Sequence, residues 1–118
     1  MLKRKPWRPG ARRLRRRRPP VGIPALEWRN APYRRFLAQT GMCIAAVAMS
    51  DWNYCAGPID PCHTRNNGMG SKGPDASCAP LCRSHHAEYD AGRSRFEAKY
   101  RVDMAAEAER WWKRFNEQ

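Results

Sequence analysis

The sequence predicts one small domain of the α+β class with a thin hydrophobic core. The chain has 118 residues, which is enough for a single domain. Several segments show helical spacing, and one short apolar run is typical of a strand or a hairpin. Ten prolines, eight glycines and a mean hydropathy of −0.87 leave few side chains to build a core. Chains this small and polar often depend on a disulfide or a bound metal ion for stability.

The individual elements are predicted from capping residues and apolar spacing. Asn30 is expected to cap a helix that has Pro32 in its first turn and ends at Gly41. Residues 42–49, MCIAAVAM, are expected to form a strand or a hairpin before a tight turn at CAGP. Residues 64–77 are rich in Gly, Asn and Ser and predict a loop. Further helices are expected from near Pro80–Cys82 to Ala91 or Gly92, over residues 94–102, and from Met104 onward behind the cap Asp103.

The first 20 residues, MLKRKPWRPGARRLRRRRPP, differ in composition from the rest of the chain. They hold ten of its 23 Lys and Arg residues and no acid, and the whole chain carries a formal net charge of +12. Such a segment repels itself and is expected to be disordered, so that residues 21–118 form the folded domain. Clustered arginines predict an arm that binds nucleic-acid phosphates, and a solubilising tail is the alternative. The arginines expected to bind are Arg12, Arg13, Arg15, Arg16, Arg17 and Arg18.

The cysteines are expected to be metal ligands in a reducing compartment. No stretch approaches the roughly 20 apolar residues of a membrane span, and no secretory signal follows the basic start. We therefore expect a cytoplasmic protein without membrane association, whose five cysteines stay reduced.

Four side chains are expected to bind one structural zinc ion. Cys82 and His85 have the C-x-x-H spacing that presents two ligands from the first turn of a helix, and Cys43 and Cys55 lie upstream. Four sulfur and nitrogen ligands are typical of a closed tetrahedral zinc site. Cys78 is a rival ligand, and its alternative role is a small buried apolar residue.

His86 cannot easily serve the same ion as His85, because neighbouring residues of a helix point about 100° apart. His86 lies four residues before Asp90, so the two share a helix face and could bind a divalent cation. A hydrogen bond between them on the helix surface is the alternative. Asp60 and His63 supply another acid and another histidine upstream.

Residues 59–86, IDPCHTRNNGMGSKGPDASCAPLCRSHH, resemble the HNH or ββα-metal endonucleases, especially the recombination-enhancing nucleases of phages and prophages. The resemblance extends over roughly residues 33–113. It implies a treble-clef ββα-metal domain in which His63 is the general base. It also implies that Cys43, Cys55, Cys82 and His85 bind the structural zinc.

The resemblance further places His86 and Asp90 at ligand positions of a catalytic Mg²⁺ or Mn²⁺ ion. Cys62 occupies the position before the base where many members have a His or Asp ligand, so we assign the third ligand to Asp60. Ser77 stands where the family has an asparagine that helps to hold the base. Lys72, in the GMGSKG loop, is expected to hold a phosphate oxygen, with a solvated loop lysine as the alternative.

The expected activity is metal-dependent cleavage of DNA in the host bacterium's cytoplasm, during phage recombination or DNA processing and with a recombination protein as a further partner. A histidine with an ordinary pKa of roughly 6.5 is a suitable base for phosphodiester hydrolysis. The competing class is a zinc-stabilised nucleic-acid-binding protein without turnover, which the substitutions at Cys62 and Ser77 favour. RNA stays an alternative substrate, because an Arg-rich arm suits both nucleic acids.

Overall fold

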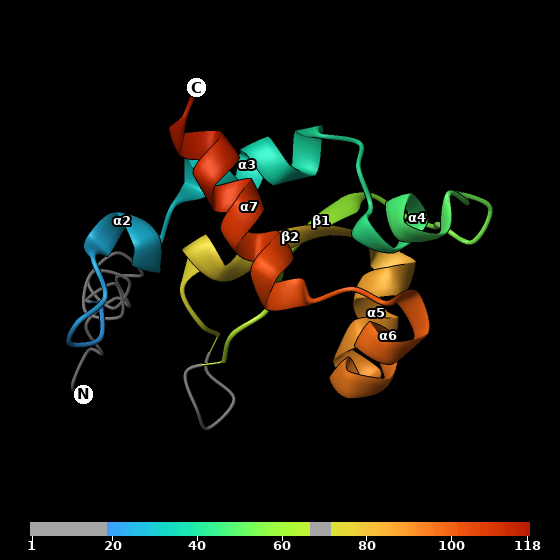
Figure 1. Ribbon diagram of the computed structural model, residues 1–118. Helices are drawn as coiled ribbons and strands as arrows, with labels where there is room; N and C mark the ends of the chain where they lie inside the picture. Colours follow the sequence, from blue (N-terminus) through green and yellow to red (C-terminus); the bar gives the residue numbers. More distant parts are fainter. Residues whose placement is uncertain (1–18, 67–71) are drawn as a thin grey trace, which may run out of the picture.

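The computed structural model describes residues 19–66 and 72–118 (Figure 1). A two-stranded antiparallel sheet surrounded by helices confirms the predicted α+β class. The elements in chain order are α2 (Ala25–Trp28), α3 (Ala31–Gln39), α4 (Ile44–Met49), β1 (Ile59–His63), the 3₁₀ turn η1 (Asp75–Ser77), β2 (Cys78–Cys82), α5 (Arg83–Ala91), α6 (Arg93–Tyr100) and α7 (Met104–Asn116). The six arginines expected to bind nucleic acid, and residues 67–71 of the glycine-rich loop, lie outside the described residues.

The sheet pairs β1 with β2 in a register that sets Ile59 opposite Cys82 and His63 opposite Cys78. Each strand carries a proline at its centre, and the two prolines, Pro61 and Pro80, face each other. The amide of Thr64 bonds to the carbonyl of Ser77 beyond one end of the sheet, and the amide of Arg83 bonds to the carbonyl of Pro58 beyond the other. Hydrogen-bonded pairs alternate along an antiparallel ladder, so the proline pair occupies a position that needs no N–H donor.

The capping predictions for two helices are confirmed, and a third helix is capped by a cysteine. The Asn30 side chain accepts a hydrogen bond from the amide of Tyr33 at the start of α3, and Asp103 accepts one from Ala106 at the start of α7. Cys82 ends β2 and also caps α5, where its sulfur accepts from the amide of His85. The helix α5 therefore follows the hairpin with no intervening loop.

The prediction of a strand or hairpin over residues 42–49 is wrong, because this segment contains the helix α4. A short apolar run does not distinguish a buried strand from a buried helix by its spacing. Three of its six helical residues are alanine, the strongest helix former, and Ile44, Ala45 and Ala46 are buried against the rest of the domain. The strands instead occupy residues 59–63 and 78–82, for which no strand was predicted.

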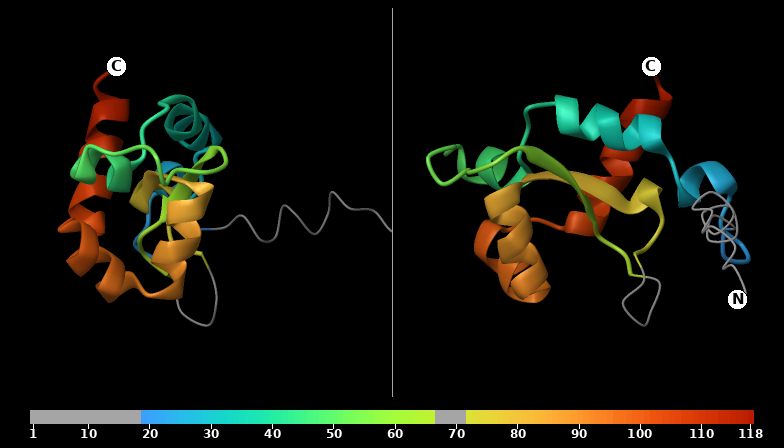
Figure 2. Two further views of the ribbon diagram at one scale, coloured as in Figure 1. Left: turned by 90° about the vertical axis from the view of Figure 1, so that its right-hand side faces the viewer. Right: turned by 180° about the vertical axis from the view of Figure 1, so that it is seen from behind.

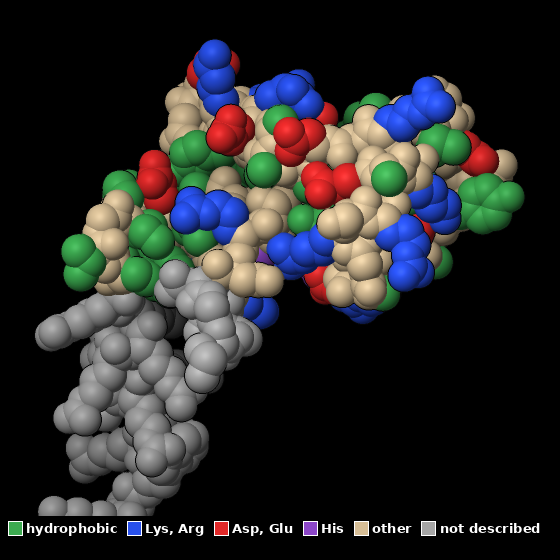
Figure 3. Space-filling view, turned by 60° about the horizontal axis from the view of Figure 1, so that its bottom comes forward, with side chains coloured by type: hydrophobic (Ala, Val, Ile, Leu, Met, Phe, Trp, Pro, Cys, Tyr) green, Lys and Arg blue, Asp and Glu red, His purple; other side chains and the backbone are tan. Residues whose placement is uncertain are grey.

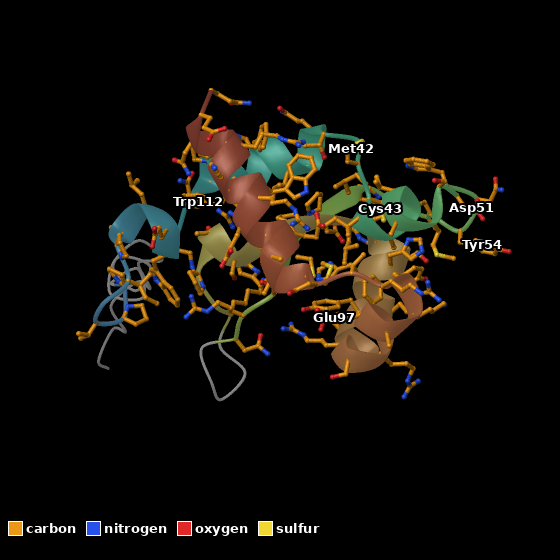
Figure 4. All side chains as sticks on the ribbon, viewed as in Figure 1. Met42, Cys43, Asp51, Tyr54, Glu97 and Trp112 are labelled. Atoms are coloured by element: carbon orange, nitrogen blue, oxygen red, sulfur yellow. The ribbon has the colours of Figure 1, made fainter. Side chains whose placement is uncertain are left out.

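The core lies between two groups of helices that cover the hairpin. Figures 1 and 2 show α3 and α7 side by side at one end of the molecule, and α5 and α6 at the other. Tyr33 of α3 is fully buried and donates a hydrogen bond from its hydroxyl to the carbonyl of Cys78, 2.8 Å away. Trp111 of α7 is buried, while Trp112 of α7 packs edge-on against Tyr33 (Figure 4).

None of the helices in the described part of the chain is long and apolar enough to span a bilayer.

Candidate metal and nuclease site

The four residues expected to bind zinc lie together. Cys43 is the N-cap residue of α4 (Figure 4). Cys55 lies in the loop between α4 and β1, and Cys82 and His85 come from the junction of β2 and α5. The Nδ1 atom of His85 is 3.0 Å from the sulfur of Cys82, 3.4 Å from that of Cys43 and 3.7 Å from that of Cys55. The ligand atoms of all four lie within 4.8 Å of one another.

These distances are close to those of a tetrahedral zinc site. Zinc binds sulfur at about 2.3 Å and imidazole nitrogen at about 2.0–2.1 Å, so a tetrahedral angle separates the two atoms by about 3.6 Å. The measured sulfur-to-nitrogen distances of 3.0–3.7 Å bracket this value. The cluster is therefore compatible with zinc, and its donor set is that of a structural site.

One amide from the turn after Cys55 and one from the first turn of α5 donate to the sulfur of Cys82. The sulfur of Cys82 accepts from the amides of His85 and Ala56; burial opposes ionisation, but these hydrogen bonds hold the pKa of the Cys82 thiol below its ordinary value. Burial and the neighbouring Cys82 and Cys43 sulfurs raise the pKa of Cys55 to about 12. Gly57 has φ +81°, and a Cβ there would lie 2.8 Å from that of Arg83, so the predicted tight turn requires glycine.

The gap of eleven residues between Cys43 and Cys55 has a structural reason. The helix α4 fills it: Cys43 is the N-cap residue directly before that helix, and Cys55 lies in the turn that follows the helix. Cys78 lies apart from this cluster: it is fully buried in β2, where burial raises the pKa of its thiol. Its surroundings match the alternative of a small buried residue.

Four of the five residues expected to act on the substrate or to hold its metal ion line one cleft of about 600 Å³, and Asp60 is not among the residues that line it. The face of the molecule in Figure 3 carries Lys and Arg side chains around a small exposed patch of histidine. The cleft collects residues from α3, β1, the loop after it, α5 and α6. They are Arg34, Pro61, His63, Asn66, Lys72, His86, Asp90 and Arg93.

His86 lies between two carboxylates. The Nε2 atom of His86 is 3.3 Å from Asp90, the predicted partner four residues on, and its Nδ1 atom is 3.2 Å from Asp60. Asp60 also contacts Arg83. Burial opposes ionisation of Asp60, but hydrogen bonds from Arg83 and His86 keep its pKa below the ordinary value.

Cys62 is the third member of a cluster of possible metal ligands that also contains His86 and Asp90. One ligand atom from each of Cys62, His86 and Asp90 lies within 4.8 Å of the others, whereas Asp60 approaches the opposite nitrogen of the His86 ring. Burial, together with the charges of Asp90 and Asp60, raises the pKa of the Cys62 thiol to about 12. The geometry thus sets Cys62 where the sequence analysis set Asp60.

His63 is held by Asp75, which the sequence analysis did not include among the site residues. The Nε2 atom of His63 is 2.9 Å from Oδ1 of Asp75. The hydroxyl of Ser77 donates instead to the carbonyl of Pro74. The signal for Asp75 in the sequence was its place two residues before Ser77, but spacing alone cannot show that its side chain turns back toward β1.

Two arginines of the cleft were also missed. Arg93 at the start of α6 donates to the carbonyls of His63 and Thr64 and lies 3.6 Å from Asp90. Arg34 of α3 lies 3.3 Å from Asp75. No spacing or motif in the sequence distinguishes these two arginines from others. Only the packing of α3 and α6 against the hairpin brings them to one cleft.

Comparison with known proteins gives no match: no protein-family model, curated protein or solved structure is significantly similar to this chain.

Proposed function

We propose that this chain is a metal-dependent DNA endonuclease of the HNH type, with a treble-clef ββα-metal domain stabilised by zinc. The observation that carries the proposal is the convergence of His63, Lys72, His86 and Asp90 on one cleft. These residues come from three separate segments of the chain, and none of them belongs to the zinc-type cluster of Cys43, Cys55, Cys82 and His85.

His63 is the proposed general base. Its ring lines the cleft, and a neutral imidazole is suited to take a proton from a water molecule at cellular pH. Lys72 at the cleft edge provides a positive charge for a phosphate oxygen, and its backbone is fixed by a bridge to Asn66. Arg34 and Arg93 add positive charge to the same walls, which favours a polyanionic substrate.

His86 and Asp90 are the proposed ligands of a divalent cation, and their donor atoms fit one. A bound Mg²⁺ or Mn²⁺ would polarise the phosphate and neutralise the leaving oxygen. Asp60 accepts a hydrogen bond at Nδ1 of His86, which fixes the ring so that Nε2 points at the side of Asp90. The thiol of Cys62, the third member of this ligand cluster, favours ions softer than Mg²⁺, so among these two we favour Mn²⁺.

A binding protein without turnover is the second candidate. The observation that favours it is Cys62, a fully buried thiol whose pKa is raised to about 12 and which therefore resists conversion to a ligand thiolate. Under this proposal the cleft and the arm bind nucleic acid, as an accessory to phage recombination or DNA processing in the bacterial cytoplasm. The same fold and zinc content are expected in both cases.

Cleavage assays distinguish the two candidates. Purified protein is incubated with supercoiled, linear and single-stranded DNA, and with RNA, with no divalent ion, Mg²⁺ or Mn²⁺. We expect nicking of DNA only when a divalent ion is present, and a loss of roughly 10²–10⁴-fold in rate for His63→Ala at unchanged zinc content and DNA affinity. A parent protein that cleaves nothing with any ion contradicts the nuclease, and His63→Ala at parental rate contradicts the base.

A further inference from the structure

Asp75 is the most completely enclosed acid among the described residues. It lies in η1, directly before β2, and only 1% of it is exposed. One carboxylate oxygen, Oδ1, is 2.9 Å from Nε2 of His63. An isolated carboxylate in such a position would be strongly unfavourable, so the groups around it must compensate its charge.

The second carboxylate oxygen is held from the other side. The backbone amide of Asn30 donates to Oδ2 at 2.7 Å, and Nε of Arg34 lies 3.3 Å from the same atom. Burial opposes ionisation, but hydrogen bonds from His63 and Asn30 and the charge of Arg34 together hold the pKa of Asp75 below its ordinary value. Asp75 is therefore a carboxylate at neutral pH, and it can only accept hydrogen bonds.

We propose that Asp75 is the positioning residue for His63, fixing the tautomer with the proton on Nε2 and leaving Nδ1 free to accept a proton. A neutral imidazole that faces a carboxylate at one nitrogen carries its proton there, because the carboxylate has none to give. The buried carboxylate also fixes the ring plane. The catalytic meaning of this contact rests on the proposed function, whereas the tautomer itself does not.

A metal ion shared by His63, Asp75 and Cys78 is the competing explanation, since their ligand atoms also lie within 4.8 Å of one another. Both oxygens of Asp75 are already engaged by donors, and an ion would have to displace His63 or the Asn30 and Arg34 contacts. Cys78 is fully buried and its pKa is raised by burial, so a thiolate there is disfavoured. The hydrogen-bonded pair is the arrangement that leaves no buried group unsatisfied.

The ring nitrogens of His63 report the tautomer directly. In zinc-loaded protein labelled with ¹⁵N histidine, we expect the NMR signals of His63 to show a protonated Nε2 and an unprotonated Nδ1. This measurement needs no substitution and no activity. An Nδ1–H tautomer in the parent protein would overturn the proposal. A shift of the His63 signals caused by a metal ion bound between His63, Asp75 and Cys78 would also overturn it.

Asp75→Asn should invert the tautomer. The amide of Asn30 and the guanidinium of Arg34 are both donors, so the new amide oxygen is expected to face them. Its NH₂ group then faces Nε2 of His63, which must accept, and the ring proton moves to Nδ1. The matched control is Asp103→Asn, the cap of α7, where asparagine is an equally good cap and His63 should be unaffected.

A double-mutant cycle tests whether Asp75 acts through His63. We expect Asp75→Asn to lower kcat by about 10²–10⁴-fold with KM nearly unchanged, and to cause no further loss in a His63→Ala background. A full effect of Asp75→Asn in that background would refute the positioning role. If the parent protein proves inactive, the ¹⁵N measurement still decides the role of Asp75, so failure of the nuclease proposal and failure of this one are distinguishable.

Discussion

His85 and His86 are consecutive residues of α5, and their rings belong to different clusters. Nδ1 of His85 lies 3.0 Å from the sulfur of Cys82, whereas Nε2 of His86 lies 3.3 Å from Asp90 and its Nδ1 lies 3.2 Å from Asp60. The angular step of the helix separates them, as the sequence predicted. Adjacent alanine substitutions should therefore have different consequences.

His85→Ala should remove the zinc and with it the fold. The other three ligands are cysteines, and a tetrahedral site that loses its only imidazole binds zinc far more weakly. We expect one zinc per chain in the parent protein by elemental analysis, and loss of the cooperative unfolding transition in His85→Ala or after chelation. Cys78→Ala is the control, because Cys78 lies outside this cluster and should retain full zinc content. Folded parent protein without tightly held zinc would contradict the assignment.

His86→Ala should remove the second cation while the domain stays folded. The ring is partly exposed in the cleft, and its contacts are to Asp60 and Asp90 rather than to core residues. We expect parental zinc content, parental melting temperature within a few degrees, and cleavage that is lost in Mg²⁺ but partly recovered at high Mn²⁺. A variant that unfolds would show that His86 is structural.

Cys62 should determine which divalent ion the cleft accepts. Cys62→Asp replaces a buried thiol by a carboxylate, the ligand that Mg²⁺ prefers. We expect the ratio of activity in Mg²⁺ to activity in Mn²⁺ to be higher in this variant than in the parent protein. Because position 62 is fully buried, Cys62→Ala serves as the control for packing: it should lose stability and, since it adds no carboxylate, should not reach the Mg²⁺-to-Mn²⁺ activity ratio of Cys62→Asp. An identical ratio in parent and Cys62→Asp would exclude Cys62 from the ion site.

Removal of residues 1–18 should flatten the salt dependence of DNA binding. This segment carries ten Lys and Arg residues and no acid, and the cut leaves Pro20, whose carbonyl accepts from Ile23 in the first described turn. Each phosphate contact contributes about −0.9 to the slope of log affinity against log salt, so the slope should decrease in magnitude by up to about nine. The zinc content should be unchanged. Equal slopes with and without the segment would assign binding to the cleft alone.

Local signals in the sequence predicted much of this fold. Asn30, Asp103 and the C-x-x-H spacing from Cys82 to His85 each act within one helical turn, so the residues alone specify the cap or the ligand pair. The four zinc-type ligands come together as the sequence analysis expected.

The features that the sequence did not predict depend on contacts between distant segments. Pro61 and Pro80 argue against strands, and only their mutual pairing at a site without hydrogen bonds makes them acceptable. Asp75 reaches His63 because η1 folds back over β1, and Asp60 and Cys62 are distinguished only by which side of the His86 ring each approaches. No spacing rule contains this information.

The position of Cys43 makes a bound zinc ion equivalent to a covalent cross-link across the middle of the chain. Cys43 and His85 are 42 positions apart, and the ion would join α4 to the start of α5 over that distance. By analogy with a disulfide, closing a loop of this length removes about 4 kcal/mol of chain entropy from the unfolded state. The whole hairpin and the cleft residues Pro61, His63, Asn66 and Lys72 lie inside this loop, so in the metal-free chain the small apolar core alone must offset the closure entropy. Refolding should consequently be fastest when zinc is present before the denaturant is diluted.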